Sequence, residues 1–174
     1  MMKIETKAVL IVMVALIVIC IFAPIVSAET AEEWDEKGIV FAMSGEYEKA
    51  IDCFDKAIEL DANYTIAYYN RGTAYYNLKK YERAIEDYNK AIELDPNYVN
   101  AYNNRGVAYS DLMQYERAIE DYNKTIELDP NDTDAYNNRG NAYSDLMQYE
   151  RAIEDYNKAI ELDPNDAYAY NNRG

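Results

Sequence analysis

The hexapeptide AYNNRG at residues 101–106 decides the fold, because it returns at a constant spacing. This sequence or its variant AYYNRG begins at Ala67, Ala101, Ala135 and Ala169, each 34 residues after the last. The chain therefore divides into a leading segment, four full units and the start of a truncated fifth: 1–28, 31–64, 65–98, 99–132, 133–166 and 167–174. A fixed period of this length is typical of proteins built as arrays of stacked units.

Each unit is predicted to form two helices. In the third unit the second helix is YERAIEDYNKTIELDP, and its apolar residues recur at helical spacing. They are Ala118, Ile119, Tyr122, Ile126 and Leu128. The sequence Asp129–Pro130 ends this helix, because the residue before a proline is disfavoured in the α conformation. The first helix contains Gly106, which permits close approach of a neighbour. Neither helix can bury its stripe alone, so stability must come from stacking.

Small and aromatic residues at fixed places in each unit resemble the pattern of the tetratricopeptide repeat (TPR) family. In the first unit they are Trp34, Gly38, Phe41, Ala50, Phe54 and Ala57. In the second they are Tyr68, Gly72, Tyr75, Ala84, Tyr88, Ala91 and Pro96. In the third they are Tyr102, Gly106, Tyr109, Ala118, Tyr122 and Pro130, with Thr125 for an alanine. In the fourth they are Tyr136, Gly140, Tyr143, Ala152, Tyr156, Ala159 and Pro164.

The resemblance covers almost everything after Ala28 and implies an all-α, right-handed superhelix of stacked helix-turn-helix repeats. One departure is a column of cations where the family usually has leucine. It consists of Lys37, Arg71, Arg105, Arg139 and Arg173. We expect these arginines to pair with carboxylates of an adjacent helix.

The end of the chain leaves the array without the polar cap with which such arrays normally finish. We expect residues 167–174 to be too few for a stable helix. The second helix of the fourth unit would then expose its apolar side, which predicts self-association through the uncapped C-terminal end.

The segment 1–28 has the features of a signal peptide or a signal anchor. Lys3 and Lys7 precede an uncharged apolar run, 8–26, that is just long enough to cross a bilayer as a helix. Val26 and Ala28 are small residues where cleavage would require them. Positive charge before the run predicts that the repeats lie outside the cytoplasm, either secreted or anchored to the membrane by this segment.

Composition argues against several functions. The chain has no histidine and a formal net charge of -15, which disfavours nucleic acid and favours a neutral or basic partner. We predict no catalytic residues, no cofactor and no metal site, so the protein is not predicted to be an enzyme. The stretch DPNDTD at 129–134 lacks the glycine and glutamate that a calcium loop requires.

The family resemblance implies that first-helix residues at fixed offsets face the concave groove of the superhelix. One such column consists of Asn70, Asn104, Asn138 and Asn172. An amide has both donor and acceptor, so this column resembles the asparagine ladder with which some family members hold the backbone of an extended peptide. The alternative is that duplication has copied a surface asparagine that bonds only locally or to water.

Neighbouring offsets make the predicted groove polar and slightly acidic. They supply Tyr69, Asn103 and Asn137; Thr73, Val107 and Asn141; and Asn77, Asp111 and Asp145. Family members that clamp a peptide's terminal carboxylate use lysines and arginines here, so the sequence does not predict such a clamp. Most tyrosines occupy packing positions, and Tyr69 and Tyr76 are the better candidates for an exposed contact.

The leading hypothesis is a non-catalytic scaffold that binds an extended peptide or partner protein in the groove. Asp111 and Asp145 favour a basic partner. Two alternatives remain open at this stage. One is that the repeats recruit substrate for a longer enzyme or transport component, and the other is a self-assembling repeat protein.

Overall fold

The computed structural model describes residues 29–174, which form nine α-helices. They are α2 (Ala31–Met43), α3 (Tyr47–Leu60), α4 (Thr65–Asn77), α5 (Tyr81–Leu94), α6 (Val99–Asp111), α7 (Tyr115–Leu128), α8 (Thr133–Asp145), α9 (Tyr149–Leu162) and α10 (Ala167–Arg173). The predicted signal or anchor segment lies outside the described residues. Within them, no helix combines the length and the apolar character that crossing a membrane requires.

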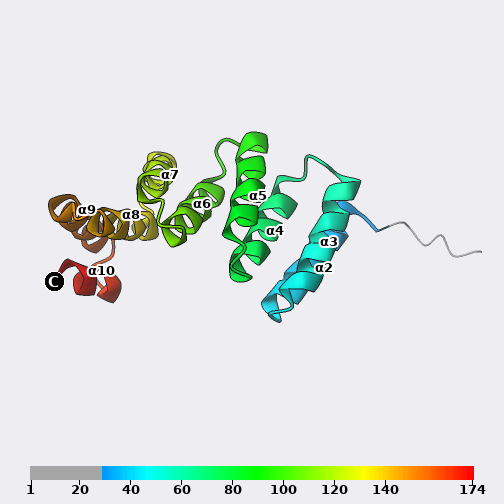
Figure 1. The fold of residues 1–174 in the computed structure, drawn as a ribbon, viewed down its shortest axis with the longest axis horizontal. Coiled ribbons are helices and arrows are strands. Elements are labelled where there is room, and N and C mark those ends of the chain that lie inside the picture. Colours follow the sequence, from blue (N-terminus) through cyan, green and yellow to red (C-terminus); the bar gives the residue numbers. More distant parts are fainter. Residues whose placement is uncertain (1–28) are drawn as a thin grey trace, which may run out of the picture.

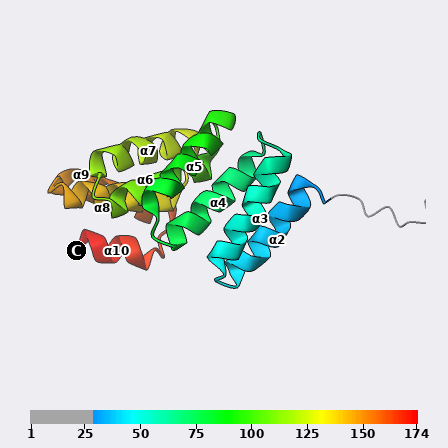
Figure 2. The same cartoon turned by 45° about the vertical axis from the view of Figure 1, so that its right-hand side comes forward.

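The helices form pairs that follow one another along an elongated array (Figure 1). Each helix packs against its neighbours in sequence, and α4, α6 and α8 also contact one another in succession. In the turned view, α5, α7 and α9 lie along one side of the array and α4, α6, α8 and α10 along the other (Figure 2). The predicted all-α superhelix of stacked helix-turn-helix units is confirmed.

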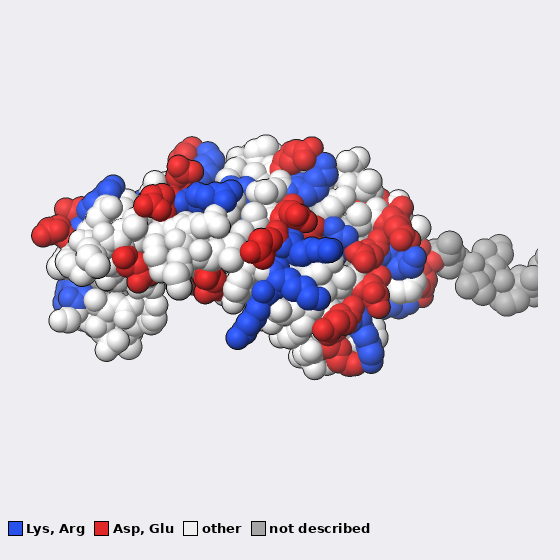
Figure 3. Space-filling model, viewed as in Figure 1, with Lys and Arg blue, Asp and Glu red and all other residues white. Residues whose placement is uncertain are grey.

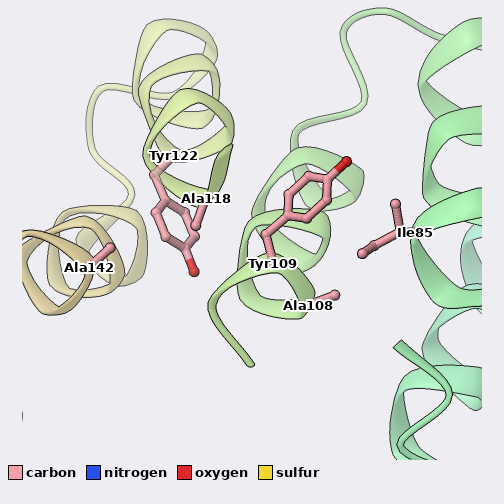
Figure 4. Packing of buried hydrophobic residues seen from close by; sticks show 6 residues of the cluster. All are labelled: Ile85, Ala108, Tyr109, Ala118, Tyr122 and Ala142. Atoms are coloured by element: carbon pink, nitrogen blue, oxygen red, sulfur yellow. The ribbon is translucent and has the colours of Figure 1, made fainter. Parts of the chain in front are cut away.

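Within a pair, an aromatic ring of the second helix packs against a glycine of the first. A Cβ atom placed on Gly106 would lie 2.7 Å from Cε1 of Tyr122, so the glycine is needed for close approach. Tyr122 and Ala118 of α7 join Tyr109 of α6 and Ile85 of α5 in one buried cluster (Figure 4). Each core cluster therefore spans a junction between units, which agrees with stability that depends on stacking.

The predicted helix ends are correct. Helix α7 stops at Leu128, directly before Asp129–Pro130. The carboxylate of Asp129 then accepts a hydrogen bond from the backbone N–H of Asn131 at 3.0 Å, which closes the turn. Asp132 caps the next helix by accepting from the N–H of Ala135 at 3.0 Å.

Arg71, Arg105 and Arg139 each pair with a carboxylate of an adjacent helix, as predicted, and each also connects three helices. Arg105 of α6 donates two hydrogen bonds to Asp121 of α7, at 2.8 and 2.5 Å, and a third to Asn89 of α5 at 2.6 Å. Arg71 and Arg139 repeat the arrangement with Asp87 and Asp155. Burial raises the pKa of Asp121, and the bonds from Arg105 oppose this rise. The departure from the family pattern thus replaces an apolar contact with a paired charge.

The expectation that residues 167–174 form no helix is wrong. Helix α10 extends from Ala167 to Arg173, and Asp166 caps it by accepting from the N–H groups of Tyr168 and Ala169. Ala169 is fully buried against Ala159 and Tyr136. An isolated helix of this length would be unstable, whereas packing on α9 and a side-chain cap stabilise this one.

Candidate functional site

We define the inner face as the set of first-helix residues at the four predicted offsets. They are Tyr69, Asn103 and Asn137; Asn70, Asn104, Asn138 and Asn172; Thr73, Val107 and Asn141; and Asn77, Asp111 and Asp145. Two cavities open on this face, and they lie at equivalent junctions two units apart. The first is bounded by Thr73, Tyr76, Asn77, Tyr88, Asn104 and Val107. The second is bounded by Asn141, Ser144, Asp145, Tyr156 and Asn172.

The asparagine column connects successive first helices. The side-chain nitrogen of Asn70 donates to Asp35 at 3.0 and 3.2 Å, and that of Asn104 donates to the hydroxyl of Tyr69 at 3.0 Å. The nitrogen of Asn138 is 3.4 Å from the amide oxygen of Asn103. Each partner lies 35 residues earlier in the chain. The side-chain nitrogen of each amide thus donates at least one hydrogen bond within the protein.

These bonds within the chain are those that the alternative interpretation of the asparagine column expects, and binding to a peptide backbone stays a prediction. Asp35 is buried, with 3% of its surface exposed, and its carboxylate only accepts hydrogen bonds at neutral pH. It therefore fixes the orientation of Asn70, with the amide oxygen as the acceptor left over. No hydrogen bond to the amide oxygen of Asn70 or Asn138 is formed by residues 29–174. A fixed column of acceptors suits donors such as the N–H groups of a peptide backbone.

The column of Tyr69, Asn103 and Asn137 lies deeper and bounds neither cavity. Tyr69 is half-buried, and its ring lies edge-on to Tyr98 with centroids 5.1 Å apart. Asn137 is buried and donates to Asp166 at 2.5 Å. These residues form the deepest column of the inner face. Tyr69 and Tyr76, the tyrosines expected to be available for contact, are each partly covered by the next unit.

The last rung of the column differs from the others. Asn172 donates to the amide oxygen of Asn141 at 3.1 Å, a residue only 31 positions earlier. The buried amide oxygen of Asn137, which the interior spacing would pair with Asn172, has no hydrogen-bond partner among the described residues. Helix α10 therefore does not reproduce the register of the interior first helices.

The two cavities differ in chemistry. The first has a volume of about 210 Å³, and the side chains of Val107, Thr73 and Tyr76 give it an apolar wall. The second has a volume of about 350 Å³ and is bounded by amide, hydroxyl and carboxylate groups. Burial raises the pKa of Tyr156 to about 12, so its hydroxyl stays protonated and donates to Asn141 at 2.9 Å.

Asp111 and Asp145, the two acidic residues of the inner face, differ in their hydrogen bonding. The carboxylate of Asp111 accepts a hydrogen bond of 2.7 Å from the hydroxyl of Tyr76. Asp145 has no hydrogen bond or ion pair with any other residue of 29–174. The interior first helices α4, α6 and α8 carry one cation each, the arginine already paired with a second-helix aspartate. In Figure 3 the surface over α6, α8 and α10 is largely uncharged, with isolated acidic side chains and a basic side chain at its left edge.

Three residues at these cavities were not predicted. Ser144 and the hydroxyls of Tyr88 and Tyr156 complete the cavity walls, together with Tyr76, which was expected to be available for contact. Tyr76 and Ser144 occupy the same offset within their units, so the 34-residue period relates them as it relates the other columns. The two second-helix tyrosines were assigned to packing, which their buried rings confirm, but their hydroxyls reach the inner face.

Family comparisons agree with this geometry. The tetratricopeptide repeat profile matches residues 65–98, 99–132 and 133–166, and a further TPR profile matches 38–79. The chain belongs to the tetratricopeptide repeat family. A comparison with curated protein sequences gives no match.

Several solved structures resemble most of this chain. A crystal structure of MamA is 30% identical, with a TM-score of 0.75 over 79% of this chain and 80% of that one. MamA from Desulfovibrio magneticus RS-1 is 26% identical, with a TM-score of 0.78 over 84% of this chain and 82% of that one. The first TPR of Spaghetti (RPAP3), bound to the HSP90 peptide SRMEEVD, is 34% identical, with a TM-score of 0.67 over 72% of this chain and 99% of that one.

TPR proteins are generally non-catalytic interaction modules, and RPAP3 binds its peptide as one of them. Within residues 29–174, no group of three or more Cys, Asp or Glu side chains is arranged to hold a metal ion. The arrangement on the inner face offers recognition by hydrogen bonds and charge.

Proposed function

We propose that the protein is a non-catalytic scaffold that binds an extended peptide segment of a partner protein along the inner face. The observation that carries this proposal is the oriented asparagine column, in which Asp35, Tyr69 and Asn103 hold the amide groups of Asn70, Asn104 and Asn138 in place. Groups that are already fixed lose little conformational freedom on binding, which favours affinity.

The partner segment is neutral or basic. The HSP90 peptide bound by RPAP3 has three acidic residues in its sequence SRMEEVD. The inner face of this chain has carboxylates at Asp111 and Asp145, and its arginines are paired with aspartates of the second helices. An acidic peptide would therefore meet like charge here, which disfavours binding.

The test is a selection of random displayed peptides on the immobilised full chain. We expect N104A/N138A to lose most of the enrichment, while N97A/N131A, which removes two exposed asparagines in turns, retains it. Asn70 is left in place because its replacement would leave buried Asp35 without its donor. Helicity measured by circular dichroism should be equal in both variants. Equal enrichment by both variants, or selection of acidic peptides, would contradict the proposal.

We also propose that the scaffold works outside the cytoplasm, secreted or membrane-anchored. The support is the leading segment, with Lys3 and Lys7 before an uncharged apolar run. The intact mass of the native protein from membranes and from medium tests this. A mass that fits residues 29–174 in the medium means secretion, and a membrane-bound full-length mass means an anchor. A cytosolic full-length protein would contradict the proposal.

Self-association through α9 is a second candidate function, favoured by the exposure of its apolar face. Ile153 is 43% exposed and Tyr149 is 55% exposed. At the other end of the array, Glu33 and Val40 occupy the places that buried Ala67 and Ala74 hold at the next junction, so α2 does not offer the same packing surface. We therefore expect two copies to pair through their C-terminal ends. Sedimentation of the wild type and of I153E tests this, and a monomer at high concentration would contradict it.

A further inference from the structure

The two cavities of the inner face are versions of one site. The residues that bound the second cavity lie two 34-residue periods after residues that bound the first. The corresponding pairs are Thr73 and Asn141, Tyr76 and Ser144, Asn77 and Asp145, Tyr88 and Tyr156, and Asn104 and Asn172. All five positions carry a polar group in both cavities, and two of the pairs are identical. The repeat architecture thus places a side-chain cavity at two points of the same face, with the chemistry changed between them.

The changes make the first cavity fit an apolar side chain. The ring of Tyr76 stands where the second cavity has the small hydroxyl of Ser144, and Thr73 offers a methyl group where the second cavity has an amide. Val107 closes the wall from the next helix. The carboxylate nearest to this junction along the face, Asp111, is already hydrogen-bonded by Tyr76. A leucine-sized side chain would find apolar contacts here and no free charge.

The changes make the second cavity fit a cation. Asp145 replaces Asn77 and has no hydrogen bond or ion pair among residues 29–174. Ser144 and the amide of Asn172 supply further oxygen atoms on the same wall. A lysine or arginine side chain needs several acceptors arranged around its charged end, and this wall provides them.

We propose that the partner peptide anchors itself by two side chains, an apolar one in the first cavity and a lysine or arginine in the second. This inference rests on the proposed function, since it assigns the specificity of the same face. Packed helices lie about 8–10 Å apart, so first helices two units apart along the array are separated by about 20 Å. An extended peptide rises about 3.3 Å per residue, so the two anchors are about six residues apart.

The test uses fluorescent peptides that carry one leucine and one lysine, about six residues apart, in both sequence orders on a neutral background. Binding to the full chain is measured by anisotropy. We expect D145N to weaken binding about tenfold, as for loss of a hydrogen bond to a charged group. The matched control is D111N, which removes the same charge from the same face where Tyr76 already occupies the carboxylate. We expect it to change affinity less than about twofold.

The peptides provide a second, independent readout. Replacing the lysine by glutamine should weaken binding to the wild type about tenfold and have no effect on D145N. Replacing the leucine by alanine should weaken binding to both proteins. Equal losses for D145N and D111N, or a lysine effect that persists in D145N, would overturn the two-anchor inference. If the peptides bind and N104A/N138A abolishes binding while D145N does not, the two-anchor inference fails and the proposed function stands. Failure of all peptides to respond to any inner-face variant would count against both.

Discussion

Helices α5 and α9 have the same 14-residue sequence, YERAIEDYNKAIEL, and different surroundings. Ile85 of α5 is 9% exposed, because α6 covers it with Ala108. The corresponding Ile153 of α9 is 43% exposed. The seven-residue α10 packs near Ala159, which lies six residues further along α9, and so does not cover Ile153. Burial in this array is therefore a property of the junction between units. Identical residues should contribute very different amounts of stability in the interior and at the end.

The largest expected difference between interior and end concerns the arginine column. Arg105 bonds twice to buried Asp121, whereas Arg173 bonds only to exposed Asn157, at 2.7 Å. R105M should lower the free energy of unfolding by about 3–5 kcal/mol, because it leaves a buried carboxylate without its partner. R173M should change it by less than about 0.5 kcal/mol. Urea denaturation measures both, and equal effects would mean that the interior pairs contribute no more than surface contacts.

The next difference concerns the two isoleucines of the identical helices. I85A should cost about 2–5 kcal/mol, since it removes a buried side chain from a cluster that joins α5, α6 and α7. I153A should cost about 1 kcal/mol or less, because its side chain is already largely in contact with water. The same urea experiment compares the two variants. A cost for I153A as large as that for I85A would show that α9 is covered in solution, for instance by a second copy.

The smallest difference concerns the aspartates that cap α8 and α10. Burial raises the pKa of Asp132, whereas the hydrogen bond from Asn137 lowers the pKa of Asp166 from its ordinary value of 3.8. A carboxyl group with a lower pKa in the folded state stabilises it above the unfolded pKa, and this contribution is lost as the pH falls through the folded pKa. The raised pKa of Asp132 has the opposite sign, so acid removes no stabilisation there.

Acid should therefore loosen α10 before it loosens the start of α8. The readout is hydrogen exchange of the two capped amides, Ala169 and Ala135, each corrected for its intrinsic exchange rate. We expect the protection of Ala169 to fall first as the pH drops below about 4. Loss of protection at Ala135 before Ala169 would mean that the opposite pKa shifts of Asp132 and Asp166 do not determine how the two caps respond to acid.

Much of this architecture could be predicted from the sequence. The period, the helix ends at Asp129–Pro130 and the pairing of the arginine column all depend on residues within one unit and its neighbour, which recur in every copy. The columns of the inner face follow from the same offsets. That these columns bind a partner stays a prediction.

What the sequence did not predict depends on where a residue lies in the array. The helix at 167–173 forms because Ala169 packs against α9, a contact that an argument from length alone does not contain. The free amide oxygen of Asn137 arises because α10 does not follow the interior register. The difference between Asp111 and Asp145 arises because Tyr76 becomes Ser144 two units later, so only one carboxylate receives a hydroxyl. Each of these three features depends on side chains that another repeat unit contributes.

The measurement that tests the central claim most directly is an NMR titration of the full chain with the leucine–lysine peptide, observed through the side-chain amide resonances of asparagine. Binding along the inner face predicts that the resonances of Asn70, Asn104 and Asn138 shift together and saturate, while those of Asn97, Asn131 and Asn165 in the turns stay unchanged. Shifts confined to the turn asparagines, or to Asn171 at the end of the array, would contradict binding along the inner face.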